Sequence, residues 1–433
     1  MDRLKTYRLK ELDDTGLDRI CRRPRIDLES LVTKVRPILE DVRRDGDAAI
    51  RRYTKKFDGI DLRDIVVDPE SLDVTLPDEE KHALDIAMRN VHRFHREQMS
   101  MNLEVETMPG VTCSRVIRPI EKVGLYVPGG SAPLPSTAVM LGVPALTAGC
   151  ETIILATPPD RNGSVPPAIA YVAQKIGAKK ILLAGGAQAI AALAWGSESV
   201  PGVDKLFGPG NQYVTAAKML LQNSEAMVSI DLPAGPSELL IIADETADPD
   251  FVAADLLSQA EHGPDSQVVL AAVSGFDLEE LETALERQLG ELPRVSIATD
   301  ALAHSFIVLA DRVEEALDFS NRYAPEHLIL NCRNAVELMD RVEHAGSVFL
   351  GGWTPESLGD YASGTNHTLP TYGYARMYSG VSLSSFQKSI TFQEATPDGL
   401  KHIGPTVETL AGMEGLDAHR LAVSRRLEKL NNG

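Results

Sequence analysis

Cysteine is scarce in this sequence of 433 residues, and its scarcity narrows the kinds of protein that the chain can be. The cysteines Cys21, Cys113, Cys150 and Cys332 are scattered and include no C-x-x-C pair. We therefore expect neither a disulfide framework nor a zinc site built from thiolates, because each needs paired or closely spaced cysteines. Unpaired thiols suit a reducing compartment, so we expect a cytoplasmic protein.

The sequence also has fewer basic than acidic residues, and its apolar segments are short. The sequence contains 43 Lys and Arg residues and 62 Asp and Glu residues. The resulting net charge of -19 repels nucleic acids and anionic lipid surfaces. The most apolar stretch, 136–149, contains a glycine and a proline and is shorter than the roughly 20 residues of a membrane-spanning helix. The first 16 residues lack an apolar core and are too acidic for a typical transit peptide. We therefore expect small-molecule chemistry, with no nucleic-acid partner and no membrane partner.

The length exceeds what one hydrophobic core usually organises, so at least two domains are expected. From Gly124 onward, short apolar runs alternate with helical stretches, which is typical of parallel sheets covered by helices. The segment 231–238, rich in Pro and Gly, separates two groups of such runs. The sequence thus predicts an α/β protein with two Rossmann-like parallel-sheet domains. The predicted strands are 152–156, 180–184, 238–243, 267–272, 305–309, 327–330 and 347–350.

Helical spacing of apolar residues predicts further helices on both sides of this region. One covers 28–57 and is interrupted at Asp45-Gly46, and a second covers 77–99. Beyond about Val381 the strand signals fade, and a charged amphipathic helix over 414–430 ends the sequence. A helical tail of this kind often packs against a partner subunit.

The most informative local feature is the pair Glu326-His327, which follows Pro325. Histidine exchanges a proton near neutral pH, and an adjacent carboxylate can activate a water or stabilise an imidazolium. The pair therefore indicates acid–base chemistry. A Glu-His pair also occurs by chance at the entrance of a strand, so its interpretation depends on the rest of the chain.

A second group of residues is suited to a metal ion. The segment 247–264 predicts a helix with Asp248 as its N-cap. Gln259 and His262 then share its last turn, where the helix dipole favours a cation. The alternative is that both side chains only cap helix carbonyls.

Further oxygen and nitrogen ligands occur towards the C-terminus. Asp360 lies in a predicted loop rich in Gly, Ser, Thr and Asn, and His419 begins the final predicted helix, preceded by Glu414. With the glutamine and histidine above, these residues make a set of two nitrogens and two oxygens that suits zinc. His367 is a rival ligand, although its own loop could use it structurally.

No G-x-G-x-x-G pattern follows a strand, so the usual dinucleotide-binding fingerprint is absent. The nearest substitute is 182–193, where a predicted strand ends at two glycines and Gln188 follows at the start of a helix. A tight strand-to-helix turn is the alternative explanation. Two other glycine-rich segments could bring Tyr126 and Asn211 to a bound molecule.

Eight segments, in this order along the chain, resemble the histidinol dehydrogenase family. The resemblance extends from about residue 25 over nearly the whole chain, and eight strings in one order are far more specific than any one of them. The strings are GLYVPGG, GGAQAIAALAWG, GPGNQYVTAAK, IDLPAGPSE, DLLSQAEHG, NRYAPEHL, GDYASGTNHTLPT and EGLDAHRLAV.

The resemblance implies a zinc-dependent, NAD-linked oxidation of L-histidinol to L-histidine through L-histidinaldehyde, the final step of histidine biosynthesis. It implies that His327 is the general base and that Glu326 activates the water that hydrates the aldehyde. The implied zinc ligands are Gln259, His262, Asp360 and His419. The implied substrate contacts are these four residues together with His327, Ser237 and Glu414. The implied NAD contacts are Tyr126, Gln188 and Asn211.

The resemblance also implies a homodimer whose active sites are shared, with the C-terminal segment crossing to the neighbour. The expected chain division has an N-terminal helical segment, 1–24, and a C-terminal dimerisation segment, 379–433. Between them, 25–125 and 237–378 are expected to form a discontinuous catalytic α/β domain. The intervening residues 126–236 are expected to form a second α/β domain on the NAD side.

Three alternative functions stay open at this point. A related zinc- and NAD-dependent dehydrogenase could act on another small polar alcohol, because architecture alone does not fix the substrate. A zinc hydrolase could use Glu326 to activate metal-bound water without any nicotinamide. A zinc-stabilised binding protein would carry out no catalysis.

Overall fold

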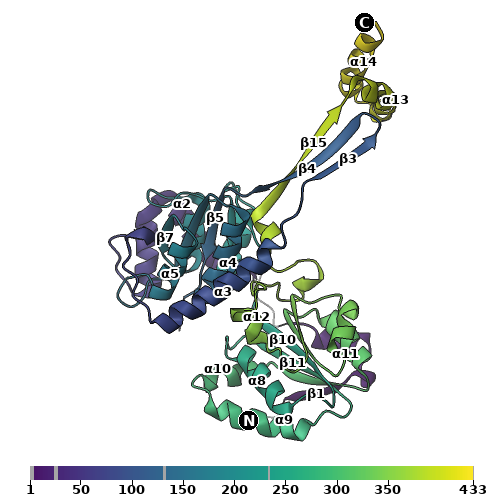
Figure 1. Ribbon diagram of the computed structural model, residues 1–433. Coiled ribbons are helices and arrows are strands. Elements are labelled where there is room, and N and C mark those ends of the chain that lie inside the picture. The colour runs from purple at the N-terminus through teal and green to yellow at the C-terminus, as the bar shows by residue number, and fades with distance from the viewer. Residues whose placement is uncertain (1–3, 24–27, 130–132, 233–234, 433) are drawn as a thin grey trace. The chain divides into compact units, whose positions relative to one another are not determined.

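The computed structural model describes residues 4–23, 28–129, 133–232 and 235–432, with the backbone alone at residue 28. The chain divides into two compact units (Figure 1). Unit 1 consists of Met1–Gln98 and Ile120–Phe386, and unit 2 consists of Met99–Pro119 and Gln387–Gly433. Among the described residues, no helix combines the length and the apolar character that a membrane span requires.

Unit 1 contains two six-stranded sheets, of which the first, sheet A, carries most of the predicted site. Its strands all run parallel, in the order β1-β12-β11-β10-β13-β14. They are β1 (Lys5–Arg8), β10 (Glu238–Ala243), β11 (Gln267–Val273), β12 (Phe306–Ala310), β13 (His327–Asn331) and β14 (Ser347–Leu350).

Helices cover both faces of sheet A, which explains why its central strands are apolar throughout. Leu239 and Ile241 of β10 pack with α8, α9 and α10, whereas Leu240 and Ile242 pack on the opposite face with α1 and α11. Figure 1 shows α8, α10 and α11 around β10 and β11. These helices are α1 (Asp14–Ile20), α8 (Pro249–Ala260), α9 (Leu278–Glu291), α10 (Val295–Leu302) and α11 (Val313–Tyr323).

The second sheet of unit 1, sheet B, has the order β2-β7-β6-β5-β8-β9, with only β2 antiparallel to its neighbour. Helices α2, α6 and α7 pack on one another, and so do α3, α4 and α5. The strands are β2 (Val66–Val67), β5 (Lys122–Tyr126), β6 (Thr152–Thr157), β7 (Lys180–Leu183), β8 (Lys205–Phe207) and β9 (Ser229–Ile230). The helices are α2 (Leu28–Asp58), α3 (Asp78–Arg96), α4 (Pro135–Ala148), α5 (Pro167–Lys175), α6 (Gly186–Trp195) and α7 (Gln212–Gln222).

The seven predicted strands and the first two predicted helices are confirmed to within a few residues. The predicted interruption of the first helix is the kink in α2 at Gly46, whose φ of 51° lies in the left-handed region that favours glycine. Segment 231–238 separates the two sheets as predicted. The last strand of sheet B in the sequence, β9, precedes this segment, and β10 and the later strands of unit 1 belong to sheet A.

Strand pairing departs from the expected division of the chain in two places. Residues 25–125 are expected to share a domain with 237–378, but their strands β2 and β5 belong to sheet B. Strand β2 pairs with β7, and β5 pairs with β6 and β8. The N-terminal segment is not only helical, since β1 extends sheet A by pairing with β12.

Unit 2 is an antiparallel three-stranded sheet, β15-β4-β3, with two helices (Figure 1). The expectation that strands end near Val381 is wrong, because β15 is nine residues long. Its only large apolar residues are Ile390 and Phe392, which are too few to show a strand pattern in the sequence. The elements are β3 (Leu103–Met108), β4 (Val111–Pro119), β15 (Gln387–Ala395), α13 (Pro397–Met413) and α14 (Asp417–Asn432).

Short helical elements complete unit 1. The α-helix α12 (Glu356–Tyr361) follows β14. The 3-10 helices are η1 (Leu9–Glu11), η2 (Pro69–Ser71), η3 (Ala335–Arg341), η4 (Tyr374–Arg376) and η5 (Leu383–Phe386).

Asp47 ties helix α2 to the loop that follows α6. Its carboxylate accepts hydrogen bonds from Ser197 Oγ at 2.6 Å and from Ser199 Oγ at 2.5 Å. Burial would raise the pKa of Asp47, but these hydrogen bonds outweigh it and hold the pKa below its usual value. A carboxyl group with a depressed pKa stabilises the fold above its unfolded-state pKa, and this stabilisation is lost as the pH falls through the folded-state pKa.

We predict that Asp47→Asn lowers the free energy of unfolding at pH 7 by about 1.5–3 kcal/mol, the range for hydrogen bonds to a charged group. The difference from the wild type should shrink as the pH falls below the unfolded pKa of about 4. Denaturant unfolding at several pH values measures both effects. Asp61→Asn, which breaks only the exposed pair with Lys55, should change stability by less than about 1 kcal/mol. A pH-independent difference for Asp47→Asn contradicts the argument.

Candidate active site and metal centre

The predicted proton-transfer pair lies where the parallel strands of sheet A begin. His327 is the first residue of β13, and Glu326 immediately precedes it. Glu238 begins the neighbouring strand β10, in which Leu239 is in register with His327. Both members of the pair are buried. The site therefore uses the amino ends of the strands of sheet A.

The same edge receives the C-terminal ends of α8 and α12, because a helix that follows a parallel strand runs back against it. Gln259 lies in the last turn of α8, and Asp360 lies near the end of α12. Two sequence expectations need correction here. His262 lies just beyond α8, where its N–H donates to the Gln259 carbonyl at 3.3 Å, and Asp360 lies in a helix and not in a loop.

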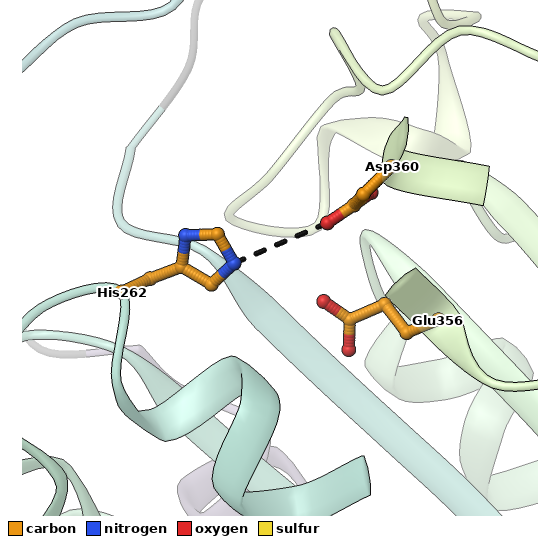
Figure 2. A group of neighbouring side chains, drawn as sticks. All are labelled: His262, Glu356 and Asp360. Atoms are coloured by element: carbon orange, nitrogen blue, oxygen red, sulfur yellow. Dashed lines mark ion pairs between the residues drawn. The ribbon is translucent and has the colours of Figure 1, made fainter. Parts of the chain in front are cut away.

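His262, Glu356 and Asp360 form a group that could hold a metal ion, as Figure 2 shows. One ligand atom from each lies within 4.8 Å of the others, and His262 Nε2 is 3.9 Å from an Asp360 carboxylate oxygen. Glu356 is absent from the sequence prediction. Its signal is the spacing of four from Asp360, which places two carboxylates on one helix face, but only once that segment is known to be helical.

Gln259 is fully buried, and both atoms of its amide group lack a hydrogen-bond partner among the described residues. The same is true of one carboxylate oxygen of Glu356. Buried polar groups are nearly always hydrogen-bonded, so unpaired ones beside a histidine and a carboxylate indicate a missing partner. The donor set of nitrogen and oxygen atoms fits a zinc ion.

The Nδ1 atom of His327 is hydrogen-bonded, whereas Nε2 contacts a carboxylate without a hydrogen bond among the described residues. Nδ1 lies 3.1 Å from the main-chain carbonyl oxygen of Glu238. A carbonyl oxygen can only accept, so Nδ1 carries a hydrogen. Nε2 lies 3.3 Å from an Asp360 carboxylate oxygen. In the neutral ring, Nε2 is therefore the nitrogen with the free lone pair, facing the metal group.

Carboxylates surround this histidine and shift the proton equilibria of the site. Burial would lower the pKa of His327, but Glu356, Glu326 and Asp360 outweigh it and raise that pKa to about 10. Burial raises the pKa of Glu326 to about 8, although His327 opposes the shift. Burial also raises the pKa of Glu356. The edge thus carries more acidic groups than it can ionise at neutral pH, and such a site attracts a cation.

A pocket in unit 1 links this edge to sheet B. On the sheet A side it is lined by Ser237 and Glu326. On the sheet B side it is lined by Gly208 and Asp231, which follow the carboxyl ends of β8 and β9. Ser237 and Glu326 thus line the same pocket, and the substrate role predicted for Ser237 stays a prediction.

His367 also lines the pocket, but the protein itself contacts both of its ring nitrogens. Nδ1 is 2.9 Å from the Asp360 carbonyl oxygen, and Nε2 is 3.4 Å from Thr137 Oγ1. These contacts favour a structural role over the rival role of ligand.

The three predicted NAD contacts lie in sheet B and its helices. The Tyr126 hydroxyl accepts a hydrogen bond from the Gly186 N–H at 3.0 Å, at the start of α6. Gln188 is buried in α6, and its side-chain oxygen has no hydrogen-bond partner among the described residues. Asn211 is the N-cap of α7 and accepts from two backbone N–H groups. Of the three side chains, only Gln188 presents an unpaired buried polar atom that a ligand could satisfy.

Glu414 and His419 belong to unit 2. Glu414 is the C-cap of α13, and His419 lies in the first turn of α14. Both side chains are exposed. Their predicted roles towards zinc and substrate stay predictions.

Comparison with known proteins agrees with these observations. The family model described as histidinol dehydrogenase matches residues 21–427. The chain is 59% identical over 429 residues to the chloroplastic histidinol dehydrogenase of Oryza sativa subsp. japonica, covering 99% of this chain and 91% of that protein. It is 56% identical over 430 residues to the histidine biosynthesis trifunctional protein of Saccharomyces cerevisiae, covering 98% of this chain and 54% of that one.

A solved structure agrees as well. The crystal structure of histidinol dehydrogenase from Elizabethkingia anophelis superposes with a TM-score of 0.92 at 50% sequence identity, covering 99% of both chains. The family match spans nearly the whole sequence, including both units and every residue of the candidate site. The chain therefore belongs to the histidinol dehydrogenase family and is an oxidoreductase of histidine biosynthesis.

Proposed function

We propose that the chain catalyses the zinc-dependent, NAD-linked oxidation of L-histidinol to L-histidine through L-histidinaldehyde. The observation that carries the proposal is the meeting, at one sheet edge, of a buried proton-transfer pair and a group of nitrogen and oxygen ligands. Family membership sets aside the hydrolase and the non-catalytic binding protein. An enzyme for another polar alcohol would be recognised by comparing NADH formation from histidinol and from other amino alcohols.

Gln259, His262, Asp360 and His419 are the residues proposed to hold zinc, and Glu356 is a candidate that only the geometry suggests. When bound, zinc would fix the amino and imidazole nitrogens of the substrate and would neutralise carboxylates that raise the pKa of His327. Ser237 and Glu414 are proposed to contact the substrate. Tyr126, Gln188 and Asn211 are proposed to lie along NAD.

His327 is proposed to act in the first oxidation, because loss of a hydride from an alcohol requires a base for the hydroxyl proton. The Glu238 carbonyl fixes the hydrogen on Nδ1 and so presents Nε2 to accept that proton. The alcohol carbon gives its hydride, with two electrons, to NAD, and the aldehyde and one NADH result.

Glu326 is proposed to act in the second oxidation. The aldehyde has no hydroxyl proton until water adds to its carbonyl, and a base is needed to take a proton from that water. Glu326 lines the pocket, and one of its carboxylate oxygens accepts from the Glu238 N–H at 2.8 Å. As water adds, protonated His327 would return its proton to the carbonyl oxygen. The neutral imidazole would then accept a proton from the hydrate, whose carbon gives its hydride to a second NAD. Four electrons leave in total.

For the proton-transfer pair, we predict that His327→Asn lowers the rate of histidinol oxidation by about 10²–10⁴-fold, the usual effect of losing a general base. Glu326→Gln should chiefly slow oxidation of histidinaldehyde supplied directly. NADH formed per histidinol consumed should be close to two for the wild type, because four electrons leave in pairs, and should fall towards one for Glu326→Gln. Equal loss in both half-reactions for Glu326→Gln contradicts this division.

For the metal, we predict that a chelator removes activity and that added zinc restores it. His262→Asn and Asp360→Asn should weaken zinc binding by at least about tenfold, because even residues that only support metal ligands have effects of that size. Equilibrium dialysis with elemental analysis measures binding independently of activity. Comparing Glu356→Gln with His419→Asn decides which of the two residues completes the site. The exposed His82→Asn is the control and should retain full zinc binding.

Unit 2 carries the observation that supports a homodimer. Many of its large apolar side chains are exposed, among them Phe392, Leu410 and Met413, the last of them 79% exposed. Exposed apolar groups gathered on one small unit mark a contact surface. We propose that a second copy of the chain covers them, and that Glu414 and His419 serve the site of that copy.

A mixing experiment tests this sharing. His327→Asn and His419→Asn chains should each be inactive alone, whereas co-refolding equal amounts should restore about a quarter of wild-type activity. In a symmetric dimer half of the mixed molecules pair unlike chains, and each such dimer contains one intact site of two. Sedimentation and differently tagged chains would show that mixed dimers form. Mixed dimers without activity would exclude shared sites.

The compartment is proposed to be the cytoplasm, in keeping with cysteines that form no disulfide. The relatives from Oryza sativa and Arabidopsis thaliana carry chloroplastic names, which belong to those proteins.

A further inference from the structure

Glu238 contacts both members of the proton-transfer pair through its main chain. Its N–H donates to a carboxylate oxygen of Glu326 at 2.8 Å, and its carbonyl oxygen lies 3.1 Å from His327 Nδ1. One peptide segment, at the first residue of β10, thus orients two side chains that begin the adjacent strand. Any displacement of this segment would move both of them.

The side chain of Glu238 is fixed by a buried ion pair with Arg23. Arg23 Nε donates to one carboxylate oxygen at 2.9 Å and Nη2 donates to the other at 2.8 Å, in the planar two-bond arrangement that only arginine provides. The Tyr372 N–H adds a third hydrogen bond at 2.9 Å. The side chains of Arg23 and Glu238 are 8% and 2% exposed, so water does not compete for these contacts.

Arg23 also reaches the turn that leads into β13. Its Nη2 donates to the Ala324 carbonyl at 3.3 Å, and its guanidinium lies 3.5 Å from the ring centre of Tyr323. Ala324 ends α11 with a φ of 54°, two residues before Glu326. The guanidinium therefore joins the start of β10 to the segment that delivers Glu326 and His327.

A buried ion pair is weak evidence for stability, because removing two charges from water offsets most of their attraction. What a fully hydrogen-bonded pair supplies is a defined geometry. We propose that Arg23 and Glu238 are positioning residues for the oxidation: their ion pair holds the main chain of Glu238 where it orients Glu326 and His327. This inference rests on the proposed function, and neither side chain is required to touch the substrate.

The test uses the full-length, zinc-loaded protein and four variants. Arg23→Lys keeps the positive charge but cannot form both hydrogen bonds of the fork. Glu238→Gln keeps the shape but removes the negative charge. The double variant Arg23→Met, Glu238→Met removes both charges, so that neither is left buried and unpaired. Asp47→Asn is the matched control, because it breaks a buried carboxylate network elsewhere in unit 1.

For the single variants we expect kcat to fall by about 10- to 100-fold in both half-reactions, as displaced catalytic groups do. The KM for histidinol should stay within about threefold, since the proposed zinc ligands that fix the substrate are neither replaced nor bonded to Arg23 or Glu238. Zinc content should equal that of the wild type. The double variant should regain thermal stability relative to the single variants while its kcat stays low. Asp47→Asn should lose stability and keep its kcat.

Two results would overturn the inference. One is a folded Arg23→Lys protein whose kcat lies within about twofold of the wild type. The other is a double variant that regains kcat together with its stability, which would show a merely structural role. The proposed function fails separately, if zinc-loaded wild-type protein forms no NADH from histidinol.

Discussion

Seven residues, 231–237, separate the end of β9 from the start of β10, and this short connection is the constraint on which the site depends. Seven extended residues span at most about 25 Å, so the carboxyl edge of sheet B and the amino edge of sheet A must lie near each other. Ligands of open parallel sheets usually bind beyond the carboxyl ends of the strands. On the sheet B side, the pocket does lie beyond the carboxyl ends of strands. Sheet A supplies the edge at which Glu326 and His327 begin a strand, and the two edges share one pocket.

The electrostatics of that edge follow from its topology. Helices α8 and α12 both return to it, and each brings the negative end of its dipole together with metal-ligating side chains. Carboxylates that would ionise readily on their own then lie close together, and their mutual repulsion disfavours the ionised forms. Burial disfavours the ionised forms further. An edge with this charge attracts a cation, and the amide of Gln259, which has no hydrogen-bond partner among the described residues, is consistent with the metal proposed there.

Local features of the chain could be predicted from sequence, because they depend on neighbouring residues. The α8 N-cap at Asp248, the break at Gly46 and the apolar strand 238–243 are of this kind. Donor chemistry suggested the proposed zinc ligands, but only the family resemblance linked them to one site, since nothing in the local pattern relates Gln259 to Asp360 a hundred residues later. Glu356 cannot be assigned from the sequence, because its segment resembles a loop rich in small residues although it forms α12.

Two further failures have physical causes of their own. The strand β15 shows too little apolar alternation to be recognised, because it lies in a unit whose sheet is largely exposed. The pairing of Arg23 with Glu238 joins residues more than two hundred positions apart, and no periodicity reports such a contact. Sequence patterns record which face of an element is buried, but they do not record which distant partner buries it.

The atoms of Glu238 that hold Glu326 and His327 belong to the peptide backbone, which every amino acid except proline provides in full. A replacement other than proline therefore cannot remove these main-chain contacts and can only shift them. The activity that a variant at position 238 retains would then depend on how far its side chain allows the first residues of β10 to move. Selection would act there on placement, whereas at position 327 it acts on chemical identity.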